Sequence, residues 1–168
     1  MKRIVLIICL LLFLLSMVLT GCENPHHQLQ EALNDYCQMI DGAMPEDLRL
    51  TVYFVPPHIF TRAPLDENDL KTFPSLMRIV VESDELAAHW ERIKKVDMSV
   101  LQPVADGFNT DARLYYVLET GNDKILDVVI SRNHCNAFVG GIEVEDNPVL
   151  YEIITPFLTE DACSTLGI

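Results

Sequence analysis

The sequence predicts an α+β fold, a single domain in which helices cover one face of an antiparallel sheet. Apolar residues recur at helical spacing over residues 28–40, and they alternate with polar residues over 48–54 as in a half-buried strand. Toward the C-terminus, three apolar runs are separated by glycine-containing turns, which is typical of an antiparallel meander. Residues 29–168 are long enough to bury one core, so we assign them to one domain.

The first helix and the first strand follow directly from these patterns. Gly42 is expected to end the helix predicted at 28–40, and Pro56-Pro57 to end the strand predicted at 48–54. The apolar side of the helix consists of Leu29, Ala32, Leu33, Tyr36 and Ile40. The strand presents Leu48, Leu50, Val52 and Phe54 on one face. Both elements therefore have one side that must be buried.

The middle of the chain predicts a short helical turn, a strand and then a longer helix. Asp66 is the expected N-cap of the turn at 67–72, and the apolar run at 77–81 predicts the second strand. Ser83 is the expected N-cap of the helix that follows, because two acidic residues occupy its first turn. The buried side of this helix consists of Leu86, Trp90 and Ile93.

The C-terminal half predicts the meander. Strands are expected at 113–119 and 125–131, joined by a turn around Gly121. A third strand is expected at 137–144, where Gly140-Gly141 predicts a bulge or a tight turn.

A last helix is predicted to follow the meander. Asn147-Pro148 is a helix start, with asparagine as the N-cap and proline in the first helical position. The apolar residues of this helix extend to Phe157, and Pro156 is expected to end or kink it. Residues 159–168 are expected to add at most one further turn.

The N-terminal segment predicts export from the cytoplasm. Lys2 and Arg3 precede an apolar run at 4–19, and two small residues and Cys22 follow it. The run covers sixteen residues, which is fewer than the roughly 20 that a membrane-spanning helix needs. We therefore predict a signal peptide at 1–21 rather than a retained helix.

The end of this segment, Leu19-Thr20-Gly21-Cys22, resembles the lipobox of bacterial lipoproteins. The resemblance implies transfer of diacylglycerol to the Cys22 thiol, cleavage between Gly21 and Cys22, and acylation of the new N-terminus. Residues 22–28 would then be a lipidated tether, and the domain would be held outside the cytoplasm at the cell membrane or outer membrane. Glu23 stands where inner-membrane lipoproteins typically have aspartate, so by the same resemblance the outer membrane is expected where one exists.

The charge of the chain argues against a nucleic-acid partner. The sequence has 25 acidic and 12 basic residues, which give a formal net charge of −13. The signal peptide includes Lys2 and Arg3 but no acidic residue, so the mature charge would be −15. Such a surface repels nucleic acid and anionic lipid headgroups alike. The lipid, rather than the protein surface, is therefore expected to provide attachment to the membrane.

Three cysteines would remain in the domain once Cys9 is removed and Cys22 is lipidated. An odd number of thiols allows either one disulfide with a free cysteine or a fully reduced set. All three pairings of Cys37, Cys135 and Cys163 are compatible with the sequence. No CxxC motif is present, so a thioredoxin-like role is unsupported.

Catalytic and metal-binding signatures are missing from the sequence. It contains no GxSxG, HExxH, P-loop or GxGxxG motif. An EF-hand loop that started at Asp106 would need glycine and glutamate where Asp111 and Val117 stand. His134-Cys135 has no second Cys/His pair at zinc spacing. We therefore predict no cofactor or metal site, and an enzymatic role is not favoured.

Arg113 and Tyr115 are the candidate ligand residues, because they share one face of a predicted strand while Tyr116 faces the core. The first hypothesis is a lipid-anchored extracytoplasmic domain that binds a partner protein or small ligand. One alternative is a small hydrolase or thiol enzyme that uses Cys and His residues. The other is a lipoprotein that binds divalent cations through its acidic surface.

Overall fold

The computed structural model describes residues 24–56, 58–104, 111–121, 123–132, 136–166 and 168. The predicted signal peptide and lipobox, including Gly21 and Cys22, lie outside these residues. So do Asp106 of the rejected EF-hand loop and the pair His134-Cys135. Among the helices that are described, none is both long enough and apolar enough to span a membrane.

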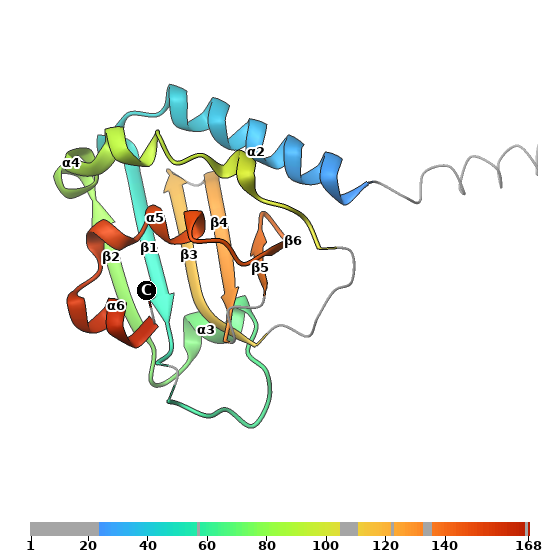
Figure 1. Ribbon diagram of the computed structural model, residues 1–168. Coiled ribbons are helices and arrows are strands. Elements are labelled where there is room, and N and C mark those ends of the chain that lie inside the picture. Colours follow the sequence, from blue (N-terminus) through green and yellow to red (C-terminus); the bar gives the residue numbers. More distant parts are fainter. Residues whose placement is uncertain (1–23, 57, 105–110, 122, 133–135, 167) are drawn as a thin grey trace, which may run out of the picture.

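The centre of the molecule is a six-stranded sheet with the strand order β2-β1-β3-β4-β5-β6 (Figure 1). Every neighbouring pair is antiparallel. The strands are β1 (Leu48–Phe54), β2 (Met77–Glu82), β3 (Ala112–Thr120), β4 (Asp123–Ser131), β5 (Asn136–Val139) and β6 (Ile142–Glu145). The single α+β domain predicted from the sequence is thereby confirmed.

Helices surround this sheet and connect its strands. The α-helices are α2 (Pro25–Gly42), α3 (Glu67–Thr72), α4 (Ser83–Ile93), α5 (Val149–Glu152) and α6 (Glu160–Leu166). Three short 3₁₀ helices are η1 (Pro45–Asp47), η2 (Met98–Val100) and η3 (Thr155–Phe157). In Figure 1, α2 lies across the strand ends with its N-terminal end pointing away from β2.

The main core lies between one face of the sheet and α2, α4, α5 and α6. Alternate strand residues such as Leu50, Val52 and Leu118 point into it, as the period of two in a strand requires. Tyr116 is fully buried there, and its hydroxyl donates a hydrogen bond to the Leu150 carbonyl oxygen at 2.6 Å. The predicted face assignments of β1 and of Tyr116 are therefore confirmed.

The second face of the sheet is covered in part by α3 and the chain on either side of it. Val55, Leu70, Tyr115 and Val117 form a smaller core on this face. The prediction of helices on one face thus holds for the main core but not for α3. The reason is that β3 presents Tyr115 and Val117 on its second face, and these apolar side chains also have to be removed from water.

The first helix begins earlier than predicted. Asn24 is the N-cap, its side chain accepts a hydrogen bond from the His26 backbone N–H at 3.1 Å, and Pro25 is the first helical residue. Residues 25–28 are therefore helical rather than part of a tether, and that part of the prediction for 22–28 is wrong. Asparagine at the N-cap and proline in the first helical position are preferred at helix starts, so this start can be predicted from the sequence.

The two predicted caps of the middle region have different outcomes. Asp66 is confirmed as an N-cap: it accepts the Asp69 backbone N–H at 2.7 Å, and the Asp69 side chain accepts the Asp66 N–H at 3.1 Å. Ser83 is not a cap but the first residue of α4, with a φ of +47°. The direct passage from strand to helix imposes this conformation, because no residue lies between β2 and α4.

The C-terminal region is divided more finely than the sequence predicted. Gly140 and Gly141 have φ values of +58° and +81°, which form a tight turn between two short strands. The predicted third strand is therefore a hairpin, and the meander has four strands. The predicted helix up to Phe157 is likewise two separate pieces, α5 and η3, because Pro156 cannot donate the backbone hydrogen bond that a continuous helix requires.

Candidate functional site

The candidate site is a groove between α2 and residues 96–103, which we call the α2 groove. Its volume is about 360 Å³. Residues of α2 at intervals of one, three and four line one wall, namely His26, Leu29, Gln30, Leu33, Asn34 and Cys37. The other wall comes from the connection that contains η2. The two walls are thus more than fifty residues apart in the sequence.

The floor of the α2 groove is apolar and belongs to the main core. Leu29, Val96, Met98 and Leu101 line it, and all four are buried. Because these side chains also pack against the rest of the core, the floor is held in place whether or not the groove is filled. Leu33 is half-buried and forms the apolar edge.

The rim of the α2 groove is mostly uncharged. Gln30, Asn34 and Gln102 present amide groups that both donate and accept hydrogen bonds. Asp97 is the one carboxylate on the rim, and it accepts the Ser99 hydroxyl at 2.6 Å and the Ser99 backbone N–H at 3.0 Å. These two hydrogen bonds lower the pKa of Asp97 and direct it toward η2. The groove therefore suits an apolar ligand with a few neutral polar groups.

Backbone hydrogen bonds to β6 position the second wall. The Glu145 N–H donates to the Gln102 carbonyl oxygen at 3.0 Å, and the Val104 N–H donates to the Glu143 carbonyl oxygen at 3.0 Å. Pro103 forms a bridge with Val144 between them. The wall of the groove is in effect a short extra strand along the sheet, so its shape depends on the sheet.

Cys37 is an exposed thiol inside the α2 groove. Cys37 and Cys163 are both free, so they do not pair with each other, and Cys135 lies outside the described residues. His26 lines the same groove but precedes Cys37 by eleven residues of α2, which is about 16 Å along a helix. These two side chains are too far apart to form a nucleophile and base pair.

Arg113 and Tyr115 do not form a ligand surface, and that prediction is corrected by the structure. They are only 4% and 1% exposed. The Arg113 guanidinium donates to the Ile59 carbonyl oxygen at 3.1 Å, to Thr61 Oγ1 at 3.0 Å and to Asp111 Oδ2 at 2.7 Å. The chain between β1 and β2 folds back over them, so Arg113 fastens that segment to the sheet.

Tyr115 is enclosed by the same segment. Its ring stacks on Tyr53 with 5.8 Å between centroids, and the Lys71 ammonium lies 4.8 Å from its centroid. Burial is the largest cause that raises the pKa of the Tyr115 phenol. Both candidates therefore have structural roles in the second core.

Acidic residues gather where β1, β2 and β3 meet, but they do not make a metal centre. Glu46, Asp47, Glu82 and Glu119 line a hollow there. Arg49 lies among them, and its Nε donates to Glu82 Oε1 at 2.5 Å. Over the described part of the chain, no group of three or more Asp, Glu, His or Cys side chains could hold a metal ion.

Comparisons with protein-family models, with curated proteins and with solved structures gave no match.

Proposed function

We propose that this chain is a lipid-anchored protein of the bacterial cell envelope whose domain binds a small, largely apolar ligand in the α2 groove. The observation that supports it best is the position of that groove next to the predicted anchor. The groove wall on α2 starts at His26, four residues after Cys22.

Chain length limits how far the groove can lie from the lipid. The helix begins at Pro25, so three residue steps separate it from Cys22. Fully extended, they span about 10 Å. A domain attached in this way presents the first turn of α2, and therefore one end of the groove, near the membrane surface, at the cell membrane or outer membrane.

The lining of the groove defines the class of ligand. An apolar floor and an amide rim favour a neutral molecule with an apolar body, and the volume lies at the lower end of the range for small-molecule sites. The net charge of the domain disfavours anionic ligands. Neither the hydrolase alternative nor the divalent-cation alternative has a matching set of side chains among the described residues.

The ligand hypothesis is tested by filling the groove. Asn34→Trp places an indole at the rim, whereas Gln38→Trp adds the same ring on α2 outside the groove. With the neutral apolar dye Nile red as the probe, we expect Asn34→Trp to weaken binding by at least about tenfold and Gln38→Trp to leave it unchanged. Equal binding by both variants, or no dye binding by the unsubstituted protein, would contradict the proposal.

The thiols provide a second measurement on the same protein. Bound dye should slow the reaction of a maleimide with Cys37, which lines the groove, and leave the reaction of Cys163 unchanged. If dye protected the two thiols to the same degree, its binding site would lie elsewhere.

The anchor is tested separately. Cys22→Ala should abolish incorporation of an alkyne-labelled palmitate and leave the signal peptide uncleaved, whereas Cys37→Ala should retain both labelling and cleavage. A Cys22→Ala protein that is still labelled, or still cleaved before residue 22, would overturn the lipoprotein assignment and leave the groove hypothesis standing.

A further inference from the structure

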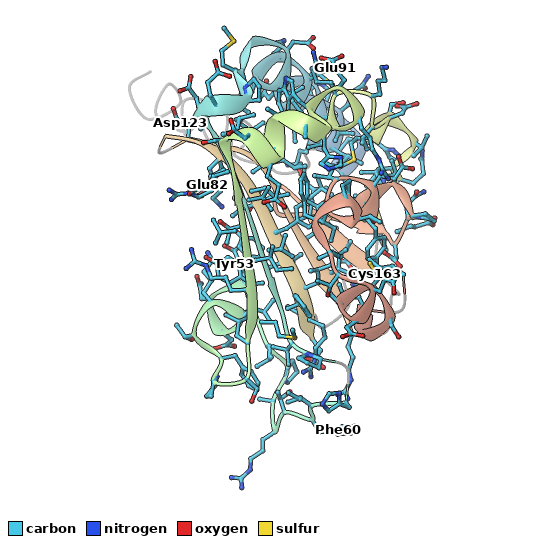
Figure 2. The ribbon with its side chains drawn as sticks, turned by 90° about the vertical axis from the view of Figure 1, so that its left-hand side faces the viewer. Tyr53, Phe60, Glu82, Glu91, Asp123 and Cys163 are labelled. Atoms are coloured by element: carbon cyan, nitrogen blue, oxygen red, sulfur yellow. The ribbon has the colours of Figure 1, made fainter. Side chains whose placement is uncertain are left out.

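One edge of the sheet is open. The backbone of β2 pairs with β1 on one side, and within the described chain no backbone hydrogen bond leaves its other side. Figure 2 views the molecule from this side and shows β2 running down its middle, with Glu82 near its upper end. Unpaired N–H and C=O groups along an edge strand are a template for another strand.

The side chains of β2 do little to prevent such pairing. Met77 is 47% exposed and Val80 is 40% exposed, which is unusual for two apolar residues of one six-residue strand. The strand contains no proline and no lysine, which are the residues that commonly block an edge. Its two charged residues, Arg78 and Glu82, have opposite signs.

The positions of these charges favour a second copy of the same strand. Arg78, Val80 and Glu82 lie on one face, as shown by their pairing with Tyr53, Thr51 and Arg49. If two β2 strands run antiparallel with Val80 opposite Val80, then Arg78 of each copy lies opposite Glu82 of the other. Oppositely charged pairs that face each other across strands are stabilising, so this register is favoured over its neighbours.

Both charged side chains are available for this pairing. The Arg78 guanidinium lies 5.6 Å from the Tyr53 ring centroid, at the surface of the sheet. The Glu82 carboxylate accepts one hydrogen bond from Arg49 and is half exposed. A carboxylate has two oxygen atoms, so Glu82 can accept from Arg78 of a second copy as well.

We propose that two copies of this chain pair through their β2 edges in this register, forming one continuous twelve-stranded sheet. The two-fold axis is perpendicular to the sheet, so each face of one copy continues into the same face of the other. Since α2 packs against the main-core face in each copy, both α2 helices lie on the same side of the dimer. Two anchors on one side are compatible with one membrane.

A cysteine at Val80 tests the register directly. The full-length protein is expressed in cells with Cys37, Cys135 and Cys163 replaced by serine, and this background is the control. Val80→Cys should form a disulfide-linked dimer under mild oxidation, because residues directly opposite in an antiparallel pair have Cα atoms within disulfide range. Arg78→Cys and Glu82→Cys should each stay monomeric alone and cross-link when expressed together.

Two outcomes would overturn the proposal. One is a Val80→Cys protein that stays monomeric while it folds normally by circular dichroism. The other is equal cross-linking at all three positions, which indicates random collision. A Val80→Cys product with a mass other than twice that of the chain would mean that a different protein occupies the edge, which also overturns it.

Charge exchange provides an independent test. In Arg78→Glu the two opposing pairs become repulsive, and in Glu82→Arg they become repulsive with the other sign. Each variant alone should dimerise at least about tenfold more weakly than the unsubstituted protein. A mixture of the two should recover a heterodimer in which every pair is again opposite in charge. If the mixture showed no recovery, the pairing of Arg78 with Glu82 would be wrong.

Discussion

The two edges of the sheet differ in how they are completed. At β6, residues 102–104 lie alongside the strand, and Glu145 and Val104 form backbone hydrogen bonds across the gap. At β2, the described chain supplies no such segment. The segment beside β6 also forms a wall of the α2 groove. Closing one edge therefore builds the candidate ligand site, and leaving the other open creates a surface for a second copy.

The largest expected effect comes from placing the same charge on both edges. Val144 of β6 is 0% exposed, so Val144→Asp buries a carboxylate and should lower the free energy of unfolding by more than about 3 kcal/mol. Val80→Asp on β2 should lower it by less than about 1 kcal/mol, since the side chain is solvated. Urea denaturation at a fixed low protein concentration measures both. Similar losses would mean that β2 is as well covered as β6.

Alkaline pH should unfold the two edges of the sheet together, because β2 and β6 pack against the same main core. Burial raises the pKa of Tyr36, Tyr116 and Tyr151, and it is the largest cause in each case. The folded state keeps these phenols protonated above about pH 10, where the unfolded chain loses the protons. The contribution of these buried phenols to the free energy of unfolding is therefore fully present below about pH 10. Above that pH it falls by up to about 1.4 kcal/mol per pH unit for each such group.

In a Tyr53→Phe background, tyrosinate absorbance and circular dichroism should therefore change in a single transition above pH 10. Phenols that ionised near pH 10 while the fold persisted would contradict the assignment of all three to one core.

A smaller effect should follow from opening the closed edge. Val104→Pro removes the N–H that donates to the Glu143 carbonyl oxygen, whereas Val104→Ala keeps it. Loss of one backbone hydrogen bond should cost about 1 kcal/mol. Hydrogen exchange at the Glu145 amide should become faster in Val104→Pro only. Because the same segment lines the groove, Nile red binding should also weaken in Val104→Pro. Unchanged dye binding would mean that the shape of the groove does not depend on this edge of the sheet.

Salt should give the smallest effect, and it should act mainly on the open edge. Between about 0.01 M and about 1 M salt, the screening length falls from roughly 30 Å to roughly 3 Å. Exposed pairs such as Arg78 and Glu82 contribute roughly 0.2–0.5 kcal/mol each, so a dimer with two such pairs should weaken by no more than about fivefold. Sedimentation equilibrium measures this change. The stability of the monomer should vary less with salt. A dimer that became stronger with salt would mean that apolar contacts, and not the Arg78–Glu82 pairs, hold the two copies together.

Local features of the fold were predictable because each depends on neighbours in the sequence. The alternation of apolar and polar residues predicts the two faces of β1. Asp66 predicts the start of α3, since this N-cap is formed by residues three apart. The start of α2 at Asn24-Pro25 is equally local, because the cap is formed within the same few residues. The positive φ of Ser83 was not accessible in this way, because it arises from joining a paired strand directly to a packed helix.

The candidate site was beyond prediction because its parts are distant in the sequence. The α2 groove requires α2 and residues 96–103 to pack together. Similarly, Arg113 was correctly placed on the face of Tyr115, but its burial depends on Ile59 and Thr61, which are more than fifty residues away. A strand pattern states which face a residue occupies, and it does not state what covers that face.

By itself, the sequence determined where most strands and helices form, which side of each is apolar, and the prediction of a lipid anchor at Cys22. Backbone preferences and apolar periodicity act within a few residues, so these features can be recognised locally. The tertiary structure alone decided that α3 covers Tyr115, that residues 102–104 lie alongside β6, and that no described segment pairs with the outer edge of β2. Those choices depend on how the whole chain buries its apolar surface, which no short segment specifies.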